Sequence, residues 1–79
     1  MKYLYQIKLS QYYNSYSYCI FADGITKHNH AIANSIEFFI KDEFVTSIIL
    51  DNEIEYIKQF DIYGELIQTI YQKENKEND

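Results

Sequence analysis

The sequence predicts an α+β domain, with an antiparallel sheet of about five strands and one helix packed on one face of the sheet. Two observations favour strands. Apolar and polar residues alternate in several short segments, as in half-buried strands, and turn residues separate these segments. One segment, residues 31–42, instead repeats its apolar residues at helical spacing. The chain has 79 residues, of which 47% are hydrophobic, so we expect a single domain with a small core.

The first two strands are predicted from alternation. Residues 2–9 place two tyrosines, an isoleucine and a leucine on one side and mostly polar side chains on the other. A turn is expected at residues 11–14, and residues 15–22 alternate again. Tyrosines fall on matching faces of the two segments, which favours antiparallel pairing between them.

A third short strand and the helix are expected next. Asp23-Gly24 is typical of a two-residue hairpin loop, and a strand over residues 25–28 is expected to follow it. Asn29 is a suitable helix N-cap. The helix should end near Asp42. Its apolar residues form one stripe, at i, i+4, i+7 and i+8, which would lie across one face of the sheet: Ile32, Ile36, Phe39 and Ile40.

Three more strands complete the predicted order ββ(β)αβββ. Residues 44–50 are rich in β-branched and apolar side chains. Residues 53–60 alternate less regularly, and Asp61-Ile62-Tyr63-Gly64 predicts a type I turn that closes with a left-handed glycine.

The C-terminal part leaves one choice open. Residues 65–71 return as a strand in this scheme, although the apolar spacing within 65–72 also fits a helix. The domain is therefore expected to occupy residues 1–72, and residues 73–79 (KENKEND) to form a disordered polar tail.

Several functional classes are disfavoured by composition. The two glycines, Gly24 and Gly64, cannot form a glycine-rich phosphate loop. His28 and His30 could face the same way on a strand, but no Cys/His cluster has zinc-finger spacing, and Cys19 or Asp23 would have to supply the further ligands across a hairpin. We therefore expect no metal, no cofactor and no enzymatic activity. The N-terminus lacks a signal-peptide pattern, and no apolar run approaches the length of a membrane span, so a cytoplasmic protein is expected.

Two further chemical functions are considered and set aside. Cys19 is the only cysteine, and its position in the middle of a strand predicts a buried, unreactive thiol. The tyrosines of the first two strands could stack nucleic-acid bases. A chain of net charge −5 without arginine is poorly suited to hold a phosphate backbone, so direct nucleic-acid binding is not expected.

The charge is unevenly distributed along the chain. Residues 1–36 carry a net charge of +2, and residues 37–79 carry −7. Such an acidic half attracts basic partners and repels phosphate. One interpretation is a solvated face that keeps a small domain soluble. The other is a surface that docks onto a larger basic protein or ribonucleoprotein. The carboxylates expected to make this contact are Asp51, Glu53, Glu55, Asp61 and Glu65.

Self-association is the second expected interaction. Phe38 falls on the polar side of the predicted helix, where an aromatic side chain is typical of an interface anchor. Leu4 and Phe21, with Cys19, fall on the sheet face that the helix does not cover. A homodimer formed through these residues would bury them.

In size, acidity and absence of catalytic motifs, the chain resembles the small inhibitors encoded by phages and mobile elements, including anti-CRISPR proteins. The resemblance implies a host defence nuclease or its guide-RNA complex as the target. We therefore expect a non-enzymatic protein-binding module, an acidic inhibitor that occupies a nucleic-acid-binding or active site of a larger protein. The alternative is a small structural adaptor that homodimerises through its aromatic sheet face.

Overall fold

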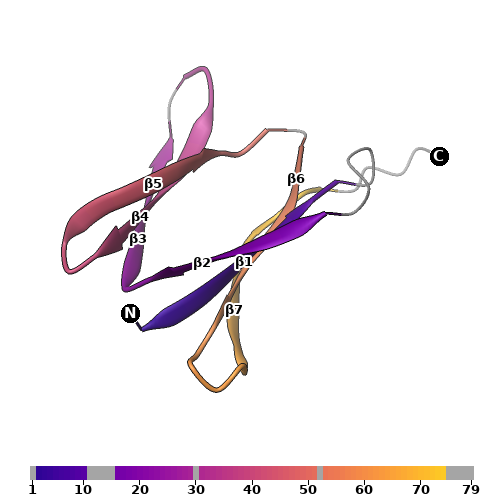
Figure 1. Cartoon of the computed structure of the whole chain (residues 1–79). Helices are drawn as coiled ribbons and strands as arrows, with labels where there is room; N and C mark the ends of the chain where they lie inside the picture. Colours follow the sequence, from indigo (N-terminus) through magenta and orange to yellow (C-terminus); the bar gives the residue numbers. More distant parts are fainter. Residues whose placement is uncertain (1, 11–15, 30, 52, 75–79) are drawn as a thin grey trace.

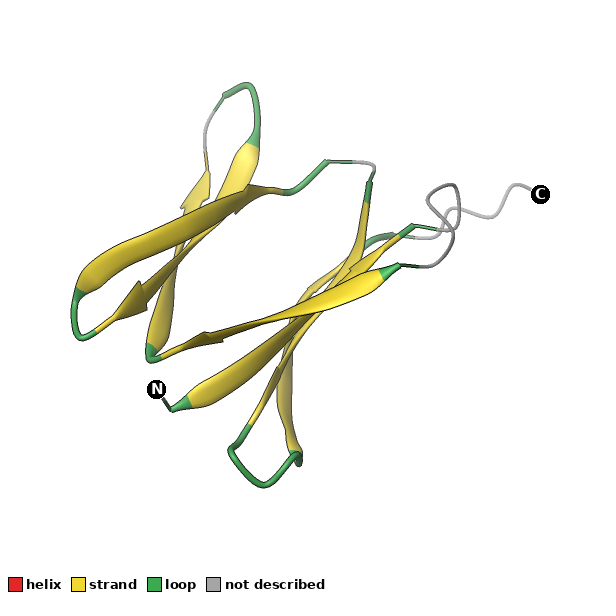
Figure 2. Cartoon of the chain, viewed as in Figure 1, coloured by secondary structure: helices red, strands yellow, loops and turns green. Residues whose placement is uncertain are grey.

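The computed structural model describes residues 2–10, 16–29, 31–51 and 53–74, and in these residues the fold is all-β, with strands and loops only (Figure 2). The predicted α+β class is therefore wrong. The strands are β1 (Tyr3–Leu9), β2 (Ser17–Ala22), β3 (Gly24–Asn29), β4 (Asn34–Ile40), β5 (Glu43–Ile49), β6 (Ile54–Phe60) and β7 (Leu66–Gln72).

The described strands form two antiparallel sheets that pack face to face (Figure 1). The four-stranded sheet has the order β2-β1-β6-β7, and the three-stranded sheet has the order β3-β4-β5. The face of the four-stranded sheet that was expected to carry a helix is thus covered by a second sheet. Two layers of this kind bury one face of each sheet and leave one face of each outside.

The segment predicted as a helix forms strand β4. Ile36, Phe38 and Ile40 alternate along it, and β4 pairs with β3 on one side and β5 on the other. A spacing of four residues, as between Ile36 and Ile40, fits both periods, so these two residues could not discriminate. Ile32, placed in the helical stripe, is 97% exposed, whereas Phe38, placed on the polar side, is fully buried.

The connection between β4 and β5 is a two-residue turn that the helix prediction missed. Lys41 and Asp42 both have positive φ, of 52° and 65°, and the flanking residues Ile40 and Glu43 pair directly. This is the geometry of a type I′ hairpin, whose twist matches that of the strands it joins. Aspartate tolerates the left-handed region better than lysine does.

Asp23 marks a corner between the two sheets and not a hairpin, which corrects the prediction for Asp23-Gly24. Strand β2 pairs with β1, and β3 pairs with β4 in the other sheet. The backbone N–H of Asp23 donates to the carbonyl oxygen of Phe39 at 2.8 Å, so pairing with β4 continues through the bend. Gly24 has no positive φ, so its conformational freedom is not used here.

The Asp23 carboxylate ties three segments together at this corner. One oxygen accepts a hydrogen bond from the backbone N–H of Lys41 at 2.8 Å, and the other accepts one from the backbone N–H of Lys2 at 3.1 Å. The bond from Lys41 is the main cause that lowers the pKa of the Asp23 carboxyl, because it favours the charged form.

The last turn and strand follow the sequence-based prediction. The N–H of Gly64 donates to the carbonyl oxygen of Asp61 at 3.0 Å, and Gly64 has a φ of 86°. Strand β7 then pairs with β6, which decides between strand and helix for residues 65–72. Extra residues opposite β6 make the pairing irregular at two positions.

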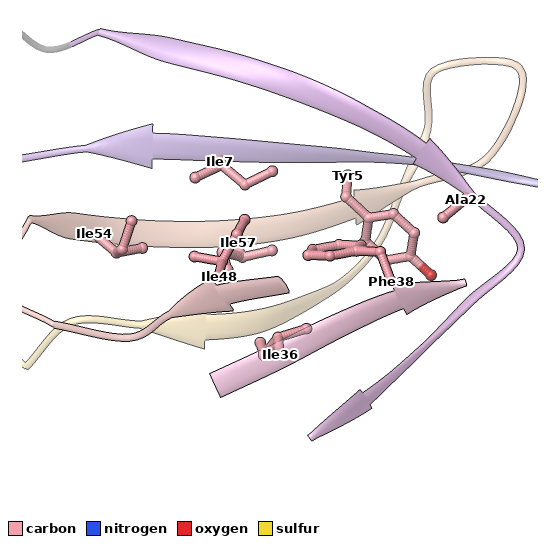
Figure 3. Close-up of a cluster of buried hydrophobic side chains, with 8 residues drawn as sticks. All are labelled: Tyr5, Ile7, Ala22, Ile36, Phe38, Ile48, Ile54 and Ile57. Carbon is pink, nitrogen blue, oxygen red and sulfur yellow. The ribbon is translucent and has the colours of Figure 1, made fainter. Parts of the chain in front are cut away.

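The core lies between the two sheets (Figure 3). Its buried hydrophobic side chains are Tyr5, Ile7, Ala22, Ile36, Phe38, Ile48, Ile54 and Ile57. The rings of Tyr5 and Phe38, which come from different sheets, meet edge to face with centroids 5.2 Å apart. This edge-to-face geometry is favourable and contributes to the packing of one sheet on the other.

One polar network enters the core. The Gln59 side-chain amide donates to the Tyr5 hydroxyl oxygen at 3.1 Å, and the Gln68 amide donates to the Gln59 side-chain oxygen at 2.8 Å. Burial raises the pKa of the Tyr5 phenol, because the low-dielectric surroundings disfavour the charged phenolate. Because these buried groups have partners, the network avoids the cost of an unsatisfied polar atom.

Some predictions fall outside the described residues: the turn at 11–14, His30, and residues 75–79 of the tail. The described residues form strands and loops, and no helix among them could span a bilayer.

Candidate protein-interaction face

The outward face of the four-stranded sheet carries a row of apolar side chains that crosses all four strands. Residues that pair directly across antiparallel strands project from the same face. Phe21 pairs with Leu4, Leu4 pairs with Phe60, and Phe60 pairs with Leu66. We call these four residues the outer apolar row. It spans all four strands of the order β2-β1-β6-β7, and its last pair, Phe60 with Leu66, lies beside one of the two irregular positions of the β6–β7 pairing.

The outer apolar row is accessible at both ends. Phe21 is 56% exposed and Leu66 is 54% exposed, while Leu4 and Phe60 between them are half-buried. The turn beyond Phe60 adds two largely exposed apolar residues, Ile62 and Tyr63. Single exposed apolar residues are common on proteins, but a contiguous group is characteristic of an interaction surface.

Two carboxylates stand beside this row because of the turn geometry. The Asp61 Oδ1 atom accepts hydrogen bonds from the backbone N–H groups of Tyr63 at 2.8 Å and Glu65 at 2.9 Å. This is the local bonding by which aspartate stabilises turns. Asp61 directly follows Phe60, and Glu65 directly precedes Leu66, so they form an acidic rim beside the part of the outer apolar row on β6 and β7.

The remainder of the outward face is polar and carries positive charge. The row next to the outer apolar row contains Lys58, and the row after that contains Lys8 and Tyr56. The Lys58 ammonium nitrogen lies 4.3 Å from the centroid of the Tyr56 ring, a cation–π contact. Along β6 the face is therefore polarised: acidic turn, apolar row, then Lys58. Lys2, two residues before Leu4 on β1, lies on the same side of the row as the acidic turn.

The structure does not bring the five predicted carboxylates together. Asp51 and Glu53 precede strand β6, whereas Asp61 and Glu65 follow it. The seven residues of β6 separate the two groups by roughly 20 Å, at about 3.3 Å per residue. Two acidic groups at opposite ends of one strand cannot contact the same small patch of a partner.

The expected pairing of Glu53 with Glu55 on one strand face is also not found. Glu53 lies in the turn before β6, where its N–H donates to Asp51 Oδ1 at 2.9 Å. Glu55 falls at an irregularity, because Tyr56 pairs with Lys8 while Ile54 pairs with Leu9. The regular two-residue spacing that would imitate successive phosphates is therefore broken.

The self-association residues divide into two groups. Leu4 and Phe21 do share the outward face with Cys19, as the predicted pairing of β1 with β2 requires. Phe38 does not: it is fully buried between the sheets, and the expectation of a surface anchor is wrong. In the predicted helix Phe38 lies off the apolar stripe, but in a strand residues two apart share a face, so Phe38 lies on the same side as Ile36.

The remaining candidate residues are those considered for thiol chemistry, metal binding and base stacking. Cys19 is exposed on β2, so its predicted burial is wrong. His28 Nε2 lies 2.9 Å from Glu37 Oε1 on the outward face of the three-stranded sheet. Within the described residues, no group of three or more His, Cys, Asp or Glu side chains could hold a metal ion. Tyr5, one of the tyrosines considered for base stacking, is in the core.

No protein-family model, no curated protein and no solved structure matches this chain. The function is therefore inferred from the geometry of the outward face. Sequence reasoning missed Phe60, Leu66 and Lys58 as members of that face. One available signal was the pair of large apolar residues, Ile62 and Tyr63, within a turn that is normally polar.

Proposed function

We propose that this chain is a non-enzymatic protein-binding module, and that its contact surface is the outer apolar row with its acidic rim. The observation that carries the proposal is the register that aligns Phe21, Leu4, Phe60 and Leu66 across the whole sheet, with both ends exposed. An apolar centre with a polar rim is the usual anatomy of a protein interface.

The finer proposal is an acidic inhibitor that acts on a larger basic protein. Asp61 and Glu65 supply negative charge next to the apolar centre, and the chain as a whole carries −5. A nucleic-acid-binding groove or active site offers the complementary basic surface. Contacts of this kind associate quickly and weaken as salt rises. A host defence nuclease complex in the cytoplasm is the target class that this proposal retains.

The acidic residues at the other end of β6 receive a different role in this proposal. Asp51 caps its own turn, and Glu53 lies roughly 20 Å from the outer apolar row by strand rise. Reversal of the charge at Glu53 should therefore have little effect on binding, whereas reversal at Glu65 should weaken it. Glu65 is preferred to Asp61 for this test, because the Asp61 side chain also stabilises the turn.

The test is a capture experiment with the full chain immobilised and an extract of the source organism. Bound proteins are identified by mass spectrometry at low and high salt. Phe21→Ser is compared with Phe44→Ser. Phe44 is a matched control because it is 58% exposed, close to the 56% of Phe21, but lies on the other sheet. A partner should be retained by the Phe44 variant and lost by the Phe21 variant.

Two results would overturn the proposal. One is a partner that binds Phe21→Ser and Glu65→Lys as well as it binds the wild type. The other is turnover of a small molecule by the purified chain. If the captured protein binds nucleic acid, competition between the chain and a labelled oligonucleotide for that protein then tests the inhibitor hypothesis. Simultaneous binding of both would exclude occupancy of the nucleic-acid site.

A further inference from the structure

The outward face of the four-stranded sheet is complementary to itself. Along β6 it carries Asp61 at one end, then the outer apolar row, then a row with Lys58. A two-fold axis that runs along the outer apolar row reverses the direction of the strands in the second copy. Such an axis brings the apolar row of one copy onto the apolar row of the other, as an isologous interface requires.

The same operation matches opposite charges. An axis along the row keeps each strand opposite its own copy, so the end of β6 faces the middle of β6 in the second copy. Asp61 is one residue beyond the row, and Lys58 is two residues before it. At about 3.3 Å per residue, the acidic turn of one copy falls over the Lys58 row of the other.

The exposed turn side chains gain cover in this arrangement. Ile62 and Tyr63 continue past the row in the same direction as Asp61. They would therefore lie over the Lys58 row of the second copy. An axis parallel to the strands would instead gather the acidic turns of both copies at the same end. Opposite charges near an interface favour one orientation over another even where they add little affinity.

From this arrangement we infer that the outward face binds a second copy of the chain, in a symmetric homodimer with strands antiparallel across the interface. The inference rests on the proposed function and names the occupant of the proposed contact surface. Because one face serves both purposes, self-association and binding of a larger partner exclude each other. The dimer is then the resting form of the protein.

The test measures the molecular mass of the full chain by sedimentation equilibrium over a concentration series. The wild type and Phe44→Ser should be dimers with similar dissociation constants. Phe21→Ser should weaken the dimer by about tenfold or more, as expected for an aromatic interface anchor. Phe21 is exposed, so the variant should keep the far-UV circular dichroism of the wild type, which is recorded alongside.

A charge exchange tests the orientation. Lys58→Glu and Glu65→Lys should each weaken the dimer, and the double variant should recover most of the loss, because opposite charges again face each other across the axis. Losses that add in the double variant would overturn the antiparallel arrangement. Equal weakening by Phe44→Ser and Phe21→Ser would overturn the choice of face.

A wild-type chain that stays monomeric up to about 1 mM would overturn the inference altogether. That result would leave the proposed function standing, since the capture experiment can still show a different protein at this face. A dimer whose face captures no other protein would have the opposite meaning: the inference would hold, and the inhibitor hypothesis would fail.

Discussion

Replacement of Phe38 by alanine separates the observed fold from the helix that the sequence predicts. In the structure, the Phe38 ring is fully buried and meets the Tyr5 ring at 5.2 Å, so alanine would leave a cavity between the sheets. On the polar face of a helix, the same substitution would be neutral or slightly stabilising, since alanine has the highest helix propensity. The two folds therefore predict opposite signs for the change in stability.

The expected loss is large for a domain of this size. Substitution of a buried phenylalanine by alanine costs about 3–5 kcal/mol. At roughly 0.05–0.15 kcal/mol per residue, the whole chain is stabilised by about 4–12 kcal/mol. Phe38→Ala should therefore remove a quarter or more of the free energy of unfolding, and at the lower bound it abolishes folding. Phe38→Leu keeps most of the volume and should cost about 1–2 kcal/mol.

Urea denaturation followed by circular dichroism measures these losses, at one protein concentration because a dimer would make stability depend on it. With a slope near 1 kcal/mol per M, the midpoint of Phe38→Ala should fall by about 3 M or more. Phe44→Ala is the control: Phe44 is exposed and loses mainly its ring contact with Phe39, so it should cost at most about 1 kcal/mol. A Phe38→Ala protein as stable as wild type would refute the packing described here.

Three further substitutions test the turns. Asp42→Gly should raise the melting temperature by about 4–8 °C, which corresponds to about 1 kcal/mol, because a positive φ at this position destabilises any residue other than glycine. An unchanged melting temperature would argue against the type I′ turn. Gly64→Ala should destabilise, with Gly24→Ala as a near-neutral control, since a positive φ is found at Gly64 but not at Gly24. Asp23→Asn should destabilise at pH 7, and its urea midpoint should approach that of wild type below about pH 4. The lowered pKa of the Asp23 carboxyl adds stability only at pH values where this carboxyl is ionised in the unfolded chain, and that stability is lost as pH falls through the pKa of the folded state. A difference between the two urea midpoints that does not change with pH would contradict this.

Local sequence patterns were sufficient where one period and one turn type fit the residues. Alternation in β1 and β2 led to the correct pairing, which puts Leu4 opposite Phe21. The type I turn was predicted because its closing glycine, Gly64, requires the left-handed region. The same reasoning failed at Asp23, because a bend between two sheets and a hairpin use similar residues. Only the partner of β3 distinguishes the two, and that partner lies further along the chain.

The candidate site was predicted in part for the same reason. Leu4 and Phe21 belong to one predicted hairpin, so their shared face followed from local pairing. Phe60 and Leu66 join that face only because β6 pairs with β1, which is far from it in sequence. The separation of Glu53 from Asp61 and Glu65 likewise depends on where β6 begins and ends, and periodicity alone did not fix those ends.

The sequence by itself determined that most of this chain would be extended, that residues 61–64 would turn, and that its second half would be acidic. The tertiary structure decided that residues 34–40 form a strand. Ile36 and Ile40 suit a helix or a strand equally, and the choice was made by hydrogen bonds to β3 and β5 and by the burial of Phe38 against Tyr5. Tertiary packing outweighs local preference here because the buried aromatic contact and two ladders of backbone bonds exceed the small differences in helix propensity.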